Sequence, residues 1–146
     1  MAVLRSVLVA CAVGLAGMLV SAVPARAGAP VTDIREIDNN TSSTVEVYYR
    51  QDQLDFKIAP GRQWPGTIWV PQVSNDSEAF NQVIIIIVPD RYDYYVFQDY
   101  TDPSQTIKYS LTRRYTGAVA VSGGTGAGRK ILTINSDGTL SMTTTT

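Results

Sequence analysis

The sequence predicts an all-β fold, a single-domain antiparallel β-sandwich, with a small β-barrel as the alternative. Stretches of alternating apolar and polar residues recur about every ten residues after position 30, separated by turn residues. Six consecutive β-branched residues, Val83–Val88, suit a central strand that is covered on both faces. No long helical pattern follows residue 27, and parallel strands would need helical crossovers.

Residues 1–27 are typical of a secretory signal peptide. Arg5 supplies the positive start, residues 7–20 form an apolar core, and Ala25-Arg26-Ala27 has the small-x-small pattern of a cleavage site. The core is short for a bilayer span, which favours cleavage over a retained anchor. We therefore expect a mature domain at 28–146 without a membrane span, located outside the cell, in the periplasm or in the cell envelope.

Composition excludes several kinds of chemistry. The one cysteine, Cys11, lies in the expected signal peptide, and the chain has no histidine. The mature domain is therefore expected to be free of disulfides, without Ser-His-Asp or Cys-His catalysis and without the usual zinc ligands. It carries ten basic and thirteen acidic residues, because Arg5 and Arg26 fall in the signal peptide. This net charge of −3 shows no clustered basic excess for nucleic-acid binding.

The first half of the mature domain predicts a strand followed by a hairpin. Residues 44–50 alternate most clearly, and a polar turn at 51–53 leads into a second alternating stretch at 54–58. Shorter apolar stretches at 31–37 and 67–70 predict two further strands.

The second half predicts an aromatic, acidic strand and a closing hairpin. Asp137-Gly138 is a strong hairpin signal between two alternating stretches at the C-terminus. Between them and the central strand lie two alternating stretches, at 92–100 and 106–112, and a short strand of small residues at 118–121. The expected strands of this half are 83–88, 92–100, 106–112, 118–121, 131–134 and 139–142.

Two segments between the strands have a different character. Residues 72–80 are polar and predict a loop with one helical turn after Ser77 or Asp76. Residues 122–128 contain four glycines and predict either a mobile loop or a close approach of backbones. A strand follows this segment, so it does not resemble a phosphate-binding loop, which leads into a helix N-terminus.

Four aspartates flank the aromatic strand and are the candidate ligands of a calcium ion. Calcium takes several oxygen ligands from carboxylates and carbonyls. A continuous strand over 92–98 would separate the two pairs by about 20 Å, too far to share one ion. We therefore expect no metal and no other cofactor, and the candidates to be tested are Asp90, Asp93, Asp99 and Asp102.

Aromatic side chains are the candidate ligand-binding residues. Tyrosine and tryptophan stack on sugars or anchor protein partners when exposed, and they fill half-buried strand faces otherwise. Trp64 lies in Gly61-Arg62-Gln63-Trp64-Pro65-Gly66, which predicts an exposed turn. The full set is Trp64, Tyr92, Tyr94, Tyr95 and Tyr100.

These features favour a secreted, non-enzymatic binding module that recognises a carbohydrate or a protein through aromatic-rich loops. One alternative is a self-assembling structural protein of the cell envelope. Another is a small secreted enzyme that uses paired carboxylates. Three Asn-x-Ser/Thr sequons, at Asn39, Asn40 and Asn75, matter only if the export route glycosylates.

The central strand at 83–88 predicts a second covered face. One face of this strand belongs to the core, and the other is expected to meet either residues 63–69 or a second subunit. Because both faces are apolar, the change Ile85→Asp is expected to prevent folding.

Overall fold

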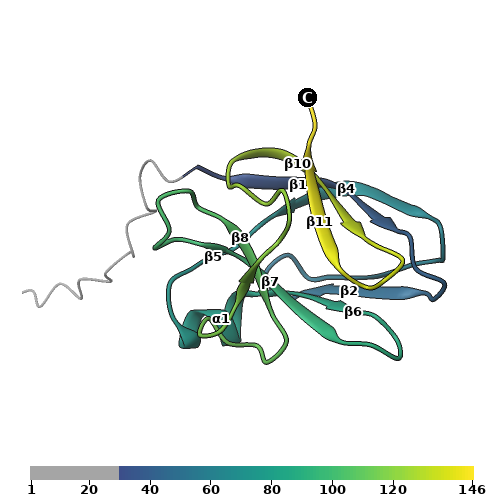
Figure 1. Cartoon of the computed structure of the whole chain (residues 1–146), viewed down its shortest axis with the longest axis horizontal. Coiled ribbons are helices and arrows are strands. Elements are labelled where there is room, and N and C mark those ends of the chain that lie inside the picture. Colours follow the sequence, from purple (N-terminus) through teal and green to yellow (C-terminus); the bar gives the residue numbers. More distant parts are fainter. Residues whose placement is uncertain (1–29) are drawn as a thin grey trace, which may run out of the picture.

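The computed structural model describes residues 30–146, which form eleven strands and one short helix (Figure 1). The expected signal peptide at 1–27 and its Cys11 lie outside the described residues. The strands are β1 (Thr32–Asn39), β2 (Val45–Tyr49), β3 (Leu54–Ile58), β4 (Gln63–Trp69), β5 (Gln72–Val73), β6 (Ile84–Ile87), β7 (Asp93–Asp99), β8 (Ile107–Ser110), β9 (Val119–Ala120), β10 (Gly128–Ile134) and β11 (Leu140–Thr144), and the helix is α1 (Asp76–Gln82).

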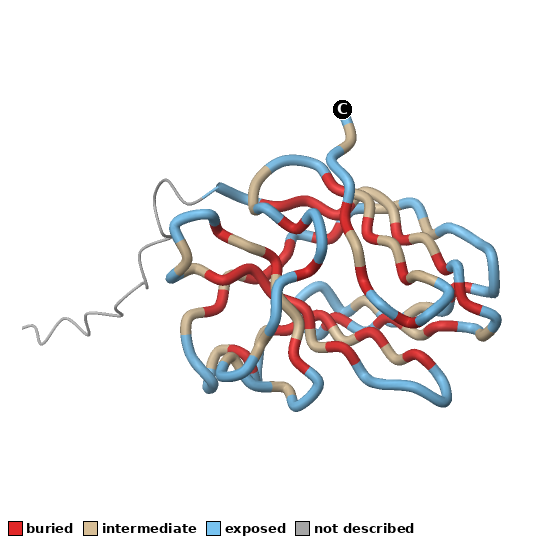
Figure 2. The backbone as a smooth tube through the Cα atoms, in the orientation of Figure 1, coloured by how far each residue is buried: buried red, intermediate tan, exposed pale blue. Residues whose placement is uncertain are grey.

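Two sheets of unequal size make up the fold. The smaller sheet has four strands in the order β11-β10-β1-β4. The larger sheet has seven, in the order β3-β2-β6-β7-β8-β9 with β5 beside β7. Buried residues alternate along the strands of both sheets and gather between them (Figure 2). The sheets are open rather than closed, which confirms the predicted β-sandwich.

Two strand pairs depart from the antiparallel pattern that the sequence suggests. β1 pairs with β10 in parallel, and β5 pairs with β7 in parallel. No crossover helix is needed for the first pair, because the chain builds the whole larger sheet between β1 and β10. The sandwich itself therefore acts as the crossover connection.

The central strand β6 presents two different faces. Ile84 and Ile86 are fully buried in the main core between the sheets. Ile85 and Ile87 point to the outer side of the larger sheet and are half-buried. β6 is thus an interior strand, paired with β2 on one side and β7 on the other, but only one of its faces is completely covered.

Helix α1 covers part of the outer face, together with the loop that follows β8. The second core consists of Val73, Ala79 of α1, Val83 and Phe97, and residues of the loop after β8 pack against it. The expectation that residues 63–69 cover this face is wrong, because these residues form β4 in the other sheet. A homo-oligomer through the outer face stays a prediction, reduced to the part that α1 and the loop leave open.

Helix α1 begins after the N-cap residue Asn75, a type of residue that favours this position. The Asn75 side chain accepts a hydrogen bond from the backbone N–H of Glu78, at 2.9 Å. In return, the Glu78 carboxylate accepts from the backbone N–H of Ser74, at 2.7 Å. This reciprocal arrangement is close to a capping box. Between residues 30 and 146, no helix has the length and apolar character needed to cross a membrane.

Asn39 links the two sheets at the end of β1. Its buried Nδ2 donates to the carbonyl oxygens of Ser43, at 2.7 Å, and of Ile58, at 2.9 Å. This nitrogen is the atom that a glycan would occupy, so glycosylation at the Asn39 sequon is incompatible with the folded state. Asn40 and Asn75 are exposed.

Candidate functional site

The inner face of the larger sheet extends beyond the smaller sheet. Tyr109 packs on the main core, and its ladder partner Val119 lies on the same face of the sheet. Leu111, directly after the end of β8, lines the same pocket as Tyr109 and Val119. Nevertheless Leu111 is 46% exposed and Val119 is 50% exposed. The four-stranded sheet is too small to cover the whole inner face of the seven-stranded sheet, so apolar side chains on that face stay exposed to solvent.

Three tyrosines form a continuous track along this open side. The rings of Tyr92 and Tyr94 meet edge to face, with their centroids 6.4 Å apart. Tyr94 and Tyr109 meet in the same way at 5.4 Å. Tyr92 is 59% exposed, whereas Tyr94 is buried and forms the floor. We call Tyr92, Tyr94, Tyr109, Leu111 and Val119 the aromatic groove.

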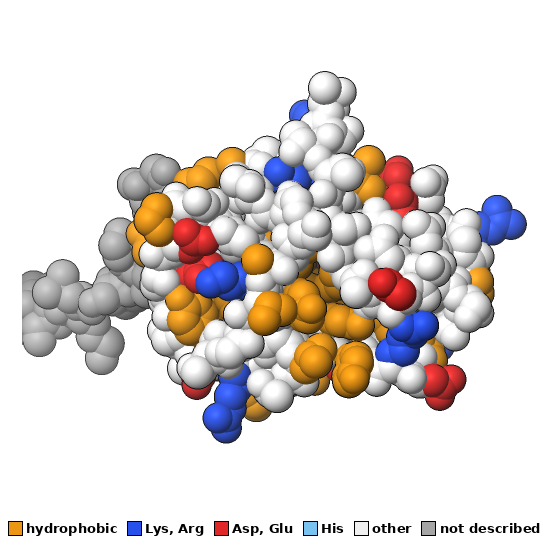
Figure 3. Space-filling model, in the orientation of Figure 1, with side chains coloured by type: hydrophobic (Ala, Val, Ile, Leu, Met, Phe, Trp, Pro, Cys, Tyr) orange, Lys and Arg blue, Asp and Glu red, His pale blue; other side chains and the backbone are white. Residues whose placement is uncertain are grey.

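The turn between β10 and β11 forms the opposite wall of the groove. The Tyr94 hydroxyl donates a hydrogen bond to the carbonyl oxygen of Gly138 in this turn. Burial and then the neighbouring Tyr109 raise the pKa of Tyr94 above its ordinary value, so it stays a neutral donor. In the space-filling view, hydrophobic side chains gather between the β10–β11 hairpin and the larger sheet (Figure 3).

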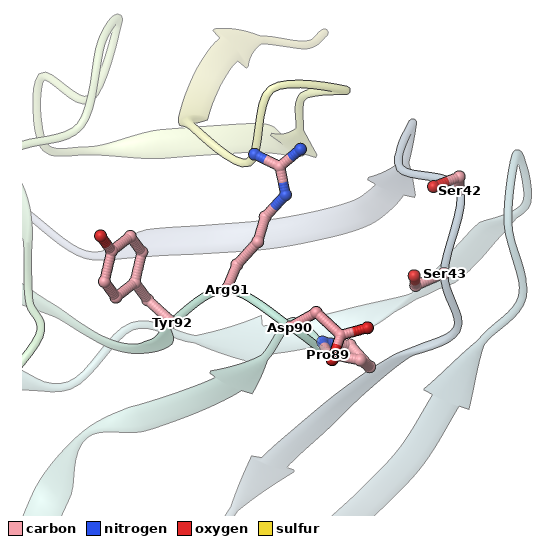
Figure 4. A pocket seen from close by; sticks show the side chains of 6 residues that line it. All are labelled: Ser42, Ser43, Pro89, Asp90, Arg91 and Tyr92. Carbon is pink, nitrogen blue, oxygen red and sulfur yellow. The ribbon is translucent and has the colours of Figure 1, made fainter.

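At the Tyr92 end of the groove lies a polar pocket of about 600 Å³, which we call the Tyr92 pocket. Arg91 reaches from the β6–β7 turn to the β10–β11 turn, where it donates to the carbonyl oxygens of Ser136, at 3.1 Å, and of Asp137 (Figure 4). These bonds hold the guanidinium in place beside the pocket. The lining residues are Ser42, Ser43, Pro89, Asp90, Arg91 and Tyr92.

At the other end, Tyr109, Leu111 and Val119 belong to the lining of a pocket of about 450 Å³, which we call the Leu111 pocket. It lies where β8 passes into the loop before β9. Its lining combines apolar side chains with hydroxyl groups, so it can take a ligand with both apolar and polar surfaces. The lining residues are Tyr109, Ser110, Leu111, Thr112, Thr116, Gly117 and Val119.

The groove contains two of the five predicted aromatic residues, Tyr92 and Tyr94. Tyr95 faces the outer side of the larger sheet and packs on the second core. Tyr100 follows β7 at the end away from Tyr92. The sequence reasoning did not select Tyr109, although its alternation with Ile107 indicated a face shared with the core.

Trp64 lies in β4 and not in an exposed turn, contrary to the prediction. Its ring stacks on Phe56 with centroids 4.2 Å apart and planes 13° apart, and it packs against the main core. Gly66 leaves room for this ring, since a Cβ there would lie 2.2 Å from it. The Pro-Gly pair suggested a turn, but an edge strand tolerates a proline.

The predicted calcium candidates are divided between the two ends of β7. Asp93 begins this strand and Asp99 ends it, with Asp90 before it and Asp102 after it. Within residues 30–146 no group of three or more acidic, histidine or cysteine side chains is placed to share a metal ion. The Asp102 carboxylate instead accepts from the backbone N–H of Ser104, at 3.0 Å.

Asp99 is a buried structural carboxylate. Lys108 Nζ lies 2.6 Å from its Oδ2, and the hydroxyls of Thr101 and Tyr115 donate to its Oδ1 at 2.9 and 3.0 Å. Burial raises the pKa of Asp99, but the hydrogen bonds from Lys108, Thr101 and Tyr115 outweigh it, so the pKa lies below its ordinary value. The group is therefore ionised in the folded protein and joins β7 to β8 and the following loop.

Acid is expected to remove the stabilisation that Asp99 provides. Because its folded-state pKa is lower than the unfolded value of about 3.9, the contribution is complete above that value and is lost as the pH falls through the folded pKa. Asp99→Asn should lower the free energy of unfolding by about 2 kcal/mol at pH 7, and the difference should shrink towards pH 2. Urea unfolding over this pH range measures it, and a constant difference would contradict the prediction.

Carboxyl groups do come together elsewhere, on the outer side of the smaller sheet. Glu36 and Asp38 alternate along β1, and the hydrogen bond between their side chains is the main reason why the pKa of Glu36 is raised. Neither residue lines the aromatic groove. Among the residues that line the two pockets, Asp90 alone carries a carboxylate. A second carboxylate, that of Asp137, lies in the β10–β11 turn, where it accepts hydrogen bonds from the backbone N–H and the hydroxyl of Thr139, at 3.0 and 2.7 Å.

No family model matches the chain, and comparisons with curated proteins and with solved structures give no match either. The function is therefore argued from the geometry of the groove.

Proposed function

We propose that the protein is a secreted binding module that recognises an elongated carbohydrate along the aromatic groove. The observation that carries the proposal is the exposed Tyr92 ring in series with Tyr94 and Tyr109. Aromatic rings bind the apolar faces of sugars, and Tyr92 is the ring of the three that is most open to solvent, whereas the buried Tyr94 supports it from below. The predicted signal peptide supports a location outside the cytoplasm.

Polar groups at both ends of the groove support a sugar over a purely apolar ligand. The Tyr92 pocket offers the hydroxyls of Ser42 and Ser43 and the anchored guanidinium of Arg91. The Leu111 pocket adds Thr112 and Thr116. A few placed polar groups around an apolar floor are the usual composition of a small-molecule site.

The residues that line the Tyr92 pocket and the Leu111 pocket favour binding without catalysis. Asp90 is the one carboxylate in the two pockets, and the chain has no histidine to act as a general base. The Asp137 carboxylate in the β10–β11 turn accepts hydrogen bonds from Thr139, and these lower its pKa, which does not suit a general acid.

A glycan array probed with the mature protein, residues 28–146, tests the proposal. We expect a bound oligosaccharide whose affinity falls at least tenfold in Tyr92→Ala, because this ring is the exposed stacking surface, and tenfold corresponds to about 1.4 kcal/mol. Tyr48→Ala is the matched control, since Tyr48 is 43% exposed on β2, which is not part of the groove.

Two results would contradict the proposal. One is the absence of any bound glycan, which would direct attention to a protein partner anchored by Tyr92 and Arg91. The other is an equal loss of binding in Tyr92→Ala and Tyr48→Ala, which would place the site outside the groove.

A further inference from the structure

A third pocket, of about 500 Å³, lies between α1 and the loop after β8. Thr112 lines both this pocket and the Leu111 pocket, so the loop separates the two. Two of its lining side chains are guanidinium groups, and one is a carboxylate. We call it the arginine pocket, and its lining residues are Asp76, Ser77, Phe80, Thr112, Arg113 and Arg114.

Arg113 is held in an unusual way at this pocket. Its backbone has φ 58°, a left-handed conformation that side chains other than glycine and asparagine rarely adopt. Its guanidinium carbon lies 4.5 Å from the centre of the Phe80 ring. Its Nε is buried and has no hydrogen-bond partner within residues 30–146. Because Nε is covered by protein atoms, contact with a ligand in the pocket falls to the two terminal nitrogens of the guanidinium.

Phe80 gives the pocket an apolar surface. It is 58% exposed, although it belongs to a helix that otherwise covers the second core. A ring that carries a guanidinium on one side and is open to solvent elsewhere can stack on the body of a ligand. The pocket thus combines a cationic group with an adjoining aromatic surface.

The loop that presents the arginines is fixed to the rest of the protein. The buried Ser110 hydroxyl accepts from the backbone N–H groups of Thr112, at 3.2 Å, and of Arg114, at 3.0 Å. The Asp76 carboxylate accepts from the backbone N–H of Thr116, at 2.8 Å. The one carboxylate of the lining therefore already has a backbone partner. Because the lining also contains two guanidinium groups, its net charge is positive.

From these contacts we infer that the arginine pocket binds an oxyanion group, a carboxylate or a sulfate ester, on a ligand whose apolar part rests on Phe80. The planar guanidinium matches both groups, because its N–H donors lie in one plane and can bond two oxygens at once. The inference does not depend on the carbohydrate proposed for the aromatic groove.

Titration of the ¹⁵N-labelled mature protein with three small aromatic probes at constant chloride tests the inference. Benzoate and phenyl sulfate present the two oxyanions on an aromatic body, and benzyl alcohol is the neutral control. We expect saturable shifts of the amides at 76–80 and 112–116 with one or both anions and none with benzyl alcohol. The anion that binds more tightly identifies the carboxylate or the sulfate as the preferred group.

Arg113→Asn separates a binding role from a structural one. Asparagine tolerates the left-handed backbone but carries no guanidinium, so we expect binding to weaken at least tenfold and the melting temperature to stay the same. Arg62→Asn, at an exposed position in the turn before β4, is the matched control and should bind as the wild type does. If Arg113→Asn does not fold, Arg114→Gln provides the same comparison.

Three outcomes would overturn the inference. The anions could leave the amides of the pocket unshifted, benzyl alcohol could shift them equally, or Arg113→Asn could bind as the wild type does while it melts at a lower temperature. The last outcome would assign Arg113 to the stability of α1 through its contact with Phe80.

Discussion

Ile86→Asp is expected to leave the chain unfolded. Ile86 is fully buried in the centre of the larger sheet and faces the smaller one. Loss of the apolar side chain and burial of an unpaired carboxylate together should lower the free energy of unfolding by about 5 kcal/mol or more, comparable to the whole stability of a small domain. Circular dichroism and size-exclusion chromatography of the purified variant would show it.

Ile85→Asp is the matched control, one residue away on the same strand. Its side chain lies on the outer face and is half-buried, so a carboxylate there keeps part of its contact with water. We expect this variant to fold with reduced stability, whereas the sequence alone predicts that it does not fold. A native-like Ile86→Asp protein, or the opposite order of the two effects, would contradict the register of β6.

Gly123→Ala is expected to lower the free energy of unfolding by about 3 to 5 kcal/mol, the second large effect. The Gly123 backbone has φ 72°, and a Cβ there would lie 2.1 Å from the carbonyl oxygen of Met142. Next to it, the carbonyl of Ser122 accepts from the N–H of Met142 at 2.7 Å, so neither backbone can move away freely. Of the two alternatives for residues 122–128, the structure has the close approach of backbones at this position.

Gly117→Ala separates the effect of the clash from that of the backbone conformation. Gly117 has φ 81°, but a Cβ there would meet no atom within 4 Å. Only the left-handed backbone is then unfavourable, by about 1 to 2 kcal/mol. Urea unfolding of both variants measures the difference, and equal values would show that the contact with Met142 has no effect.

Local patterns in the sequence were enough to place most strands of the fold. The alternation of Val45, Val47 and Tyr49 predicted β2 and its buried face, and Asp137-Gly138 predicted the turn of the closing hairpin. These features depend on neighbours in the chain, and the period of two is a property of any strand. The parallel pairing of β1 with β10 could not be predicted, because its partners lie about a hundred residues apart and no local pattern specifies them.

The candidate site was predicted only in part, for the same reason. Tyr92 and Tyr94 were selected as aromatic residues, but composition alone could not separate them from Tyr95 and Trp64. The alternation along β7 puts Tyr94 and Tyr95 on opposite faces, and packing then decides which face stays open. Tyr109 joins the track because β8 pairs with β7, a contact that no short sequence window contains.

The sequence predicted where most strands lie and which of their side chains share a face, and it contains no histidine or cysteine in residues 28–146. The tertiary structure decided which of these faces is covered. Residues 83–88 are apolar on both faces of the strand. The inner face packs against the smaller sheet, whereas α1 and the loop after β8 cover only part of the outer face. Burial depends on the sizes and positions of elements far apart in the chain, and a four-stranded sheet cannot cover a seven-stranded one. The open tyrosine track is the result of that mismatch.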